Sequence, residues 1–184
     1  EYLAQAEHIG DVAFSRILDF LKPGVSELEV AAELEYQMKK AGAEDLGFNT
    51  IIASGLNSSM PHAIPGRKKL EAGDFVTMDF GCKYEGYCSD MTRTVVIGKA
   101  NDKQKEIYNV VLEAQLAGLA AVYGGKLAAD AAFAALRERK KAGRPPSLFC
   151  TVERMGIRTE MVRLSWASCR KNSQYGNFHA YVYL

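Results

Sequence analysis

Two aspartates eleven positions apart, Asp79 and Asp90, are the residues of this chain whose type and spacing could do chemistry. They lie in the stretch FVTMDFGCKYEGYCSDMTRTVV, residues 75–96, where runs of β-branched and aromatic residues flank the loop Lys83-Tyr84-Glu85-Gly86. A hairpin centred on this four-residue loop would place Asp79 directly opposite Asp90. The sequence therefore predicts two carboxylates facing each other across paired strands.

Side chains alternate along a strand, so the same pairing places four oxygen-bearing side chains on one face. These residues are Thr77, Asp79, Asp90 and Thr92. Opposed β-carbons lie about 4.5–5.5 Å apart, and like charges at that separation repel. A solvated face, a basic side chain or a divalent cation could offset the repulsion, and on spacing alone a solvated face is the commonest case.

The apolar residues around the aspartates make a solvated face less expected and leave a cation or a hydrogen-bond donor as the alternatives. Phe75, Met78 and Phe80 on one strand and Met91 and Val95 on the other indicate a partly buried hairpin. Buried carboxylates are rarely left without a cation or a hydrogen-bond donor. Threonines can orient carboxylate ligands, and oxygen ligands suit cations such as Mn, Mg or Zn.

Two amphipathic helices are predicted before the hairpin. The first has apolar residues at four-residue spacing and ends at Lys22-Pro23-Gly24: Ile9, Ala13, Ile17 and Leu21. The second begins with the capping box Ser26-x-x-Glu29 and runs to Gly42. Its apolar residues are Val30, Leu34 and Met38. Both helices are expected to be core-packing elements.

The remaining elements are a strand, a loop and two further helices. Residues 50–53 favour a short strand, and the Ser-, Pro- and Gly-rich residues 57–69 indicate a loop. Asp102 can cap a helix that ends at Gly124-Gly125, and an Ala-rich helix is predicted from about Leu127 to Lys141. We expect these helices to contribute packing rather than chemistry.

Length, composition and net charge limit the classes of protein to which the chain can belong. With 184 residues and 48% apolar content, the chain can bury one sizeable core. A net charge of +1 argues against nucleic acid or an anionic membrane as the main partner. No apolar run reaches the roughly 18 residues that span a bilayer. The four cysteines, Cys82, Cys88, Cys150 and Cys169, lack a C-x-x-C spacing, which predicts free thiols and a cytoplasmic location.

Two segments resemble a known family. The segment VTMDFGCKYEGYCSDMTRTVVIG is similar to the first metal-ligand motif of the pita-bread metallopeptidases, the group of methionine aminopeptidase, aminopeptidase P and prolidase. The residues around the two aspartates, MDFG and GYCSDMTRT, are more similar to those of the Xaa-Pro peptidases than to those of methionine aminopeptidase. Upstream, SGLNSSMPHAIPG resembles the family segment whose histidine contacts the substrate, which corresponds to His62 here. The likeness runs from about Tyr2 to about Gly143.

The resemblance implies a fold and a set of roles. The fold would be α+β, the first half of a pita-bread (creatinase/aminopeptidase-like) domain with a mostly antiparallel sheet and flanking helices. The intact family holds two divalent metal ions (Mn, Co or Zn) and cleaves peptides with proline at the second position. Asp79 would chelate one metal and Asp90 would bridge both.

His62 would stabilise the tetrahedral intermediate in such an enzyme. A lone histidine on a loop is ordinarily a surface residue, and the resemblance reverses that expectation. Pro61 and Pro65 have fixed φ and would hold the loop stiffly. An imidazole held in this way can donate to an oxyanion and can transfer protons at neutral pH.

Residues 143–184 depart from the family pattern. They carry six Lys or Arg against two Glu, a net charge of +4. The expected histidine and glutamate ligands are not recognisable, because His179 lacks flanking glycines and neither Glu153 nor Glu160 lies in a strand-like motif. We therefore expect residues 1–142 to be a partial pita-bread domain and residues 143–184 to be a basic tail, poorly structured or out of frame.

A domain without those ligands would bind one metal ion or none, and its peptidase activity would be impaired. Two alternatives to an enzyme follow: a non-catalytic module that binds peptides or proteins, or an inactive truncated product. Half of a two-fold-like domain would also leave a sheet face and edge uncovered, and exposed edges favour association. The isolated chain is therefore expected to aggregate or to form a homodimer through the exposed sheet.

Overall fold

The computed structural model describes residues 1–121, with side chains described as far as residue 117. Residues Glu1–Asn101 form one compact unit, and the second unit begins at Asp102 with the helix α3 (Asp102–Ala121). Helix α3 begins at the residue predicted to cap it. No helix within residues 1–121 is both long enough and apolar enough to cross a membrane.

The first unit opens with two helices, α1 (Tyr2–Ile17) and α2 (Glu27–Lys40), separated by the 3-10 turn η1 (Leu18–Phe20). The predicted capping box at the start of α2 is confirmed. The Ser26 hydroxyl accepts a hydrogen bond from the Glu29 amide at 3.3 Å, and the Glu29 carboxylate accepts one from the Ser26 amide at 2.7 Å. Leu21 lies beyond α1, because η1 ends the α-helix at Ile17.

The strands form two three-stranded antiparallel sheets. One has the order β1 (Asp45–Leu46), β4 (Cys82–Tyr84) and β5 (Tyr87–Cys88). The other has the order β2 (Ile51–Ser54), β3 (Phe75–Phe80) and β6 (Met91–Val96). A second 3-10 turn, η2 (Gly55–Ser59), follows β2 directly. Strand β2 begins one residue later than the predicted strand at residues 50–53.

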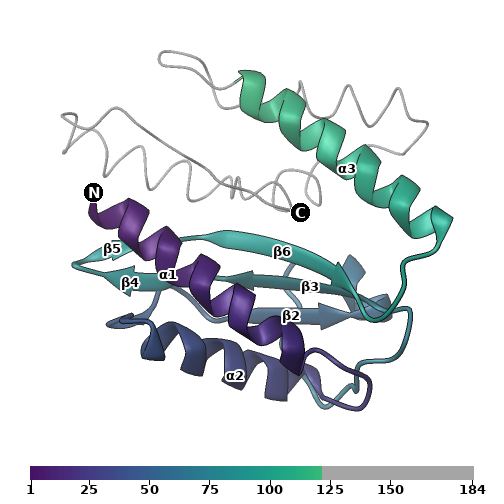
Figure 1. Ribbon diagram of the computed structural model, residues 1–184, viewed down its shortest axis with the longest axis horizontal. Coiled ribbons are helices and arrows are strands. Elements are labelled where there is room, and N and C mark those ends of the chain that lie inside the picture. The colour runs from purple at the N-terminus through teal and green to yellow at the C-terminus, as the bar shows by residue number, and fades with distance from the viewer. Residues whose placement is uncertain (122–184) are drawn as a thin grey trace. The chain divides into compact units, whose positions relative to one another are not determined.

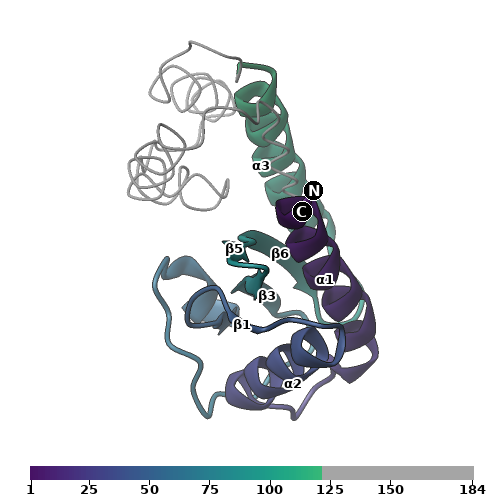
Figure 2. The same ribbon diagram turned by 90° about the vertical axis from the view of Figure 1, so that its left-hand side faces the viewer.

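Helices α1 and α2 cover one face of the β2-β3-β6 sheet, as the two perpendicular views show (Figures 1 and 2). The core between them consists of fully buried side chains from both layers, among them Ile9, Leu34, Met38, Val76, Met78 and Phe80. Gly10 allows the close approach of α1, since a β-carbon there would lie 2.6 Å from the Met91 Cε atom. Helix packing therefore occupies one side of the sheet.

The hairpin register differs from the prediction. Asp79 pairs with Thr92 and Thr77 pairs with Thr94, so Asp90 is not directly opposite Asp79. The turn consists of two residues, Glu85 and Gly86, between the paired Tyr84 and Tyr87. Both turn residues have positive φ, 48° and 79°, which is the geometry of a two-residue hairpin turn. A glutamate rarely adopts this conformation, so the sequence pointed instead to a longer loop.

The α+β fold with antiparallel sheets and flanking helices is confirmed for the described part of the chain. Three predictions concern residues outside it: the helix at about 127–141, the boundary at residue 143 and the basic tail.

Candidate functional site

Asp79 lies in the middle of the sheet, on the face opposite α1 and α2. It is half-buried in β3, between Ile51 of β2 and Thr92 of β6. Strand alternation places Thr77 and Thr94 on the same face, where the Thr94 hydroxyl donates to the Thr77 hydroxyl at 3.4 Å. The face predicted to carry oxygen ligands is therefore formed, with Thr94 as an additional member.

Asp90 immediately precedes β6 and is half-buried. Both sheets keep the same hairpin register on either side of Gly81, so continuing it sets Asp90 across from Gly81 and diagonal to Asp79. Diagonal neighbours on one face are about 7–8 Å apart, which is within reach of two side chains that share a bound group. On this register the two aspartates share a face, and the pairing differs from the predicted one by two residues, because Asp79 lies opposite Thr92.

Ser89 fixes the backbone just before Asp90. Its amide donates to the Cys82 carbonyl at 2.8 Å, and its fully buried hydroxyl accepts from the Cys82 amide at 3.0 Å. A β-carbon on Gly81 would lie 2.0 Å from the Ser89 carbonyl oxygen, so only glycine fits there. The close contact between the backbone at Gly81 and the backbone at Ser89 therefore sets the position of Asp90.

Glu7 of α1 is a site neighbour that sequence reasoning missed. Its carboxylate accepts a hydrogen bond from the Asp90 amide at 3.3 Å, and burial raises its pKa to about 7. The Asp90 amide and Arg93 oppose that rise, while the charges of Asp90 and Asp11 add to it. Helix α1 thus places a third carboxyl group beside the backbone of Asp90.

Arg93 ties the same helix to β6. Its guanidinium is almost fully buried, lies 2.7 Å from the Asp11 carboxylate, and stands 5.7 Å from the Phe14 ring centre. Arg93 and Met78 are paired across the strands on the helix-covered side. This contact holds α1 over the end of the strand that follows Asp90.

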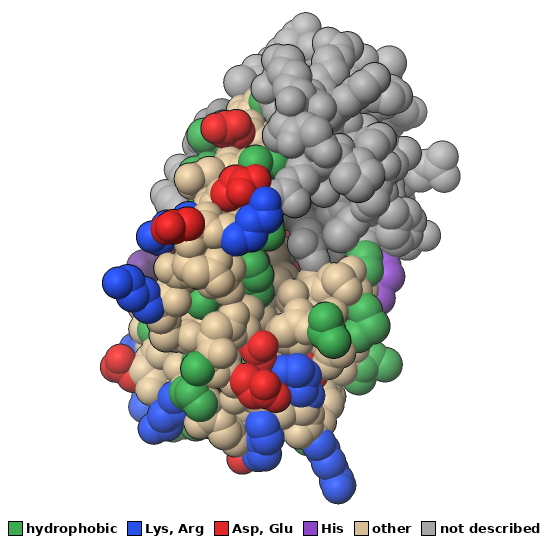
Figure 3. Space-filling view, turned by 90° about the vertical axis from the view of Figure 1, so that its right-hand side faces the viewer, with side chains coloured by type: hydrophobic (Ala, Val, Ile, Leu, Met, Phe, Trp, Pro, Cys, Tyr) green, Lys and Arg blue, Asp and Glu red, His purple; other side chains and the backbone are tan. Residues whose placement is uncertain are grey.

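His62 is exposed on the loop that connects β2 to β3. We call residues 55–65 the His62 loop. Three large apolar side chains of this loop are also exposed: Leu56 at 91%, Ile64 at 88% and Met60 at 48%. Figure 3 shows hydrophobic side chains gathered beside a histidine at the right-hand edge, whereas basic and acidic side chains are interspersed over the rest of the described face. The loop thus exposes the His62 imidazole and three large apolar side chains.

The donor set suits part of a hard-cation site. Asp79 and Asp90 supply carboxylate oxygens, and the neighbouring threonines supply hydroxyls, which is the chemistry that Mn and Mg prefer. Within residues 1–121, however, no group of three or more His, Cys, Asp or Glu side chains is arranged to hold a metal ion. The two aspartates therefore fit part of a ligand set that other residues would have to complete.

The comparisons with known proteins identify the family. A sequence model of metallopeptidase family M24 matches residues 1–162. The chain belongs to this family. It is 50% identical over 129 residues to the uncharacterized peptidase YqhT of Bacillus subtilis (strain 168), a match that covers 70% of this chain and 36% of the relative. It is 49% identical over 113 residues to an Xaa-Pro dipeptidase of Pyrococcus horikoshii, covering 61% of this chain and 32% of the relative.

Solved structures of the same family match the fold. An Xaa-Pro dipeptidase from Bacillus anthracis superposes with a TM-score of 0.74 at 48% identity over 77% of this chain. Prolidase from Pyrococcus furiosus superposes with a TM-score of 0.74 at 42% identity, again over 77% of this chain. These matches cover 40% and 42% of the respective structures. This M24 chain thus corresponds to part of a pita-bread fold and spans well under half the length of its relatives.

Proposed function

We propose that this chain carries the amino-terminal part of the catalytic domain of an M24 peptidase that cleaves the first peptide bond of Xaa-Pro substrates. The observation that carries the proposal is the shared face of Asp79 and Asp90, half-buried and bordered by threonines on the side of the sheet opposite α1 and α2. The similarity to proteins named Xaa-Pro dipeptidase supports the choice of substrate.

Each residue has a definite role in this proposal. Asp79 and Asp90 would hold the divalent cations, with Asp90 as the ligand common to both, and the neighbouring threonines would orient both carboxylates. Two such cations, when bound, would lower the pKa of a shared water and polarise the scissile carbonyl. His62 donates a hydrogen bond to the oxyanion that develops on that carbonyl, and the apolar residues of its loop contact the substrate.

The 184-residue chain by itself should hydrolyse Xaa-Pro bonds negligibly. No histidine or glutamate ligand is recognisable in the sequence after Gly143. Losing a general base alone costs about 10²–10⁴-fold in rate, and losing metal ligands costs more. The proposed activity therefore belongs to a protein in which the ligand set is complete.

Metal analysis of the purified chain tests the proposal. We expect calorimetry with MnCl₂ to show one weak site, which disappears in the double variant Asp79→Asn/Asp90→Asn, and Ala-Pro hydrolysis at background. Two tightly bound ions with chelator-sensitive hydrolysis would mean that the residues after Gly143 complete the site. A wild-type chain that binds no cation would overturn the proposal and favour the non-catalytic binding module.

Three narrower expectations complete the proposal: manganese as the metal, a cytoplasmic location and a homodimer. Cys82 and Cys88 are free thiols, which suits a reducing compartment. The homodimer would form through the sheet face and edge that a partial domain leaves uncovered. Light scattering coupled to size-exclusion chromatography tests this, and a strictly monomeric chain would contradict it.

A further inference from the structure

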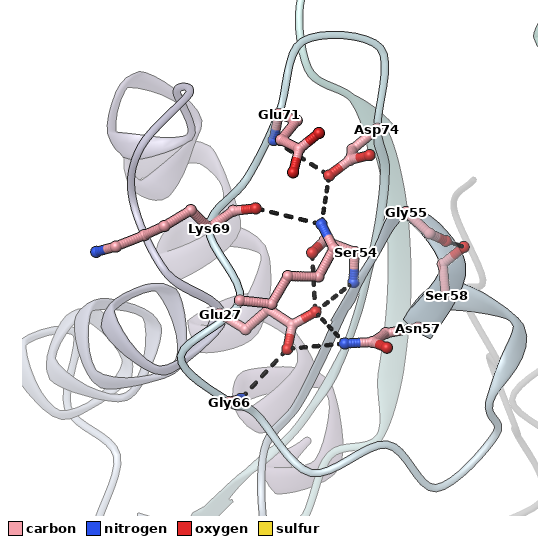
Figure 4. A network of polar contacts seen from close by, with 10 residues as sticks. Glu27, Ser54, Gly55, Asn57, Ser58, Gly66, Lys69, Glu71 and Asp74 are labelled. Atoms are coloured by element: carbon pink, nitrogen blue, oxygen red, sulfur yellow. Dashed lines mark hydrogen bonds and ion pairs between the residues drawn. The ribbon is translucent and has the colours of Figure 1, made fainter.

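A buried carboxylate that the proposed chemistry does not use lies at the base of the His62 loop. Glu27 is the first residue of α2 and is 1% exposed. Its side chain points toward the two ends of the loop (Figure 4). We call Glu27 together with Ser54, Asn57 and Gly66 the Glu27 cluster.

The Glu27 carboxylate accepts hydrogen bonds from both ends of the loop. Its Oε1 atom accepts from the Ser54 amide and the Ser54 hydroxyl, both at 2.8 Å, and from the Asn57 side-chain amide at 3.1 Å. Its Oε2 atom accepts from the Gly66 amide at 3.2 Å. The Glu27 side chain therefore joins the end of β2, the turn η2 and Gly66, the residue that directly follows the loop.

The chemistry of this cluster favours a carboxylate over an amide of the same size. An ionised carboxylate only accepts hydrogen bonds, and the two backbone N–H groups and the Asn57 amide only donate them here. Glutamine would bring an NH₂ group against at least one of these donors. The amino-terminal end of α2 also favours a negative charge, which lowers the cost of burying one.

Within the described residues, backbone hydrogen bonds tie the return side of the loop to α2 independently of this carboxylate, whereas Ser54 on the outgoing side is paired with Val76 in the sheet. The Leu28 amide donates to the Gly66 carbonyl at 3.0 Å, and the Glu27 amide donates to the Lys68 carbonyl at 3.0 Å. Ser54 and Asn57, at the outgoing side, are bound to α2 through the Glu27 side chain. Loss of the carboxylate should therefore release the outgoing side, which includes η2, more than the return side.

We propose that Glu27 is a positioning residue that fixes His62 relative to the aspartate face by pinning both ends of its loop to α2. Strand β2 pairs with β3 so that Ile51 lies across from Asp79, and the pinned Ser54 is the last residue of β2. Ser54, at which the loop is anchored, therefore lies three residues after Ile51, the residue paired with Asp79. The consequence for catalysis rests on the proposed peptidase function, whereas the anchoring itself does not.

Hydrogen exchange of the 184-residue chain tests the anchoring. In Glu27→Gln, the Gly66 amide and the amides in residues 54–59 should exchange about 10- to 100-fold faster, because the NH₂ group opposes one of the donors and a neutral amide oxygen is a weaker acceptor than a carboxylate for the others. Glu29→Gln, the same change two residues away on the same helix, should speed exchange at Ser26 and leave residues 54–59 unchanged. Unaltered exchange at residues 54–59 in folded Glu27→Gln would overturn the proposal.

A second variant covers the case in which Glu27→Gln does not fold. Asn57→Ala removes one contact and keeps the buried carboxylate with its two backbone donors. It should speed exchange in residues 56–60 and leave the core helices protected. Exchange equal to that of the unmodified chain would contradict the role of the cluster in holding η2.

Paramagnetic broadening by Mn²⁺ links the anchor to the site. With Mn²⁺ added, the Thr92 amide and the His62 ring protons should broaden together in the unmodified chain and in Glu29→Gln. In Glu27→Gln, Thr92 should broaden as before and His62 several-fold less, because the ring no longer keeps one distance from the aspartates. Equal broadening of His62 in both variants would refute the positioning role, whereas no broadening of Thr92 in any chain would refute the proposed metal site instead.

Discussion

The two faces of the β2-β3-β6 sheet carry different kinds of residue: one face carries buried apolar side chains, and the other carries half-buried polar side chains that include Asp79. On the helix-covered face, Val76, Met78 and Phe80 are fully buried in the core. On the opposite face of the same strand, Thr77 and Asp79 are half-buried. One strand thus supplies stability with every second residue and candidate chemistry with the residues between. We call the face that carries Thr77 and Asp79 the chemical face. Because the core residues lie on the other face, substitutions on the chemical face should have little effect on the free energy of unfolding.

The largest expected effect is on the covered face. Phe80→Ala should lower the free energy of unfolding by about 3–5 kcal/mol, because it removes a fully buried ring and leaves a cavity. Thr77→Ala, three residues away on the other face, should cost about 1 kcal/mol through the hydrogen bond shared with Thr94. Urea unfolding measures both. Equal losses would mean that the two faces are not energetically separate.

The next largest effect on stability is expected at Gly81, which lies between β3 of one sheet and β4 of the other. Gly81→Ala should cost about 1–3 kcal/mol, because the new β-carbon meets the Ser89 carbonyl oxygen and the backbone must shift. Because Ser89 precedes Asp90, the variant should also weaken Mn²⁺ binding measured by calorimetry. Gly66→Ala is the control, since the nearest atom to its β-carbon lies 3.7 Å away. Unchanged metal affinity in Gly81→Ala would show that Ser89 does not set the position of Asp90.

Substitutions on the chemical face should affect binding without affecting folding. Asp79→Asn and Asp90→Asn should each weaken Mn²⁺ binding at the one weak site at least about 10-fold, and in a protein with the complete ligand set Asp90→Asn should have the larger effect, because a bridging ligand serves both ions. The urea midpoint should change little in either variant. The comparison between the faces fails if either variant unfolds at much lower urea, and the bridging role fails if Asp79→Asn has the larger effect on binding in the protein with the complete ligand set.

The smallest effect should come from Glu29, which lies away from both faces. Hydrogen bonds from the Ser26 side chain and amide and from Lys69 lower its pKa from 4.5 to about 2. Ionised Glu29 therefore stabilises the folded chain above about pH 4.5, and that contribution is lost as the pH falls toward 2. The stability difference between wild type and Glu29→Gln should be greatest near neutral pH and shrink below 4.5, as thermal unfolding at several pH values can measure. A difference independent of pH would contradict the role of the carboxylate charge, and altered Mn²⁺ affinity would link α2 to the site.

The sequence alone determined the local elements. Apolar spacing located α1 and α2, the Ser26–Glu29 box located the start of α2, and strand alternation placed Asp79 and the threonines on one face. These features depend on residues a few positions apart, whose periodicity is visible in the sequence. The motif around Asp79 and Asp90 also indicated the family before any comparison.

The tertiary structure decided the register and the buried acids. The turn at Glu85-Gly86 adopts a conformation that glutamate rarely takes, so propensity favoured a longer loop and the predicted pairing was wrong by two residues. Glu27 did leave a signal, because it is in register with the apolar residues Val30, Ala31 and Leu34 of α2. What no local pattern could supply are its partners, 27 to 39 residues away, or the contact between Glu7 and Asp90 across 83 residues. Burial of a carboxylate depends on which distant donors the packed chain brings to it, and only the folded structure shows them.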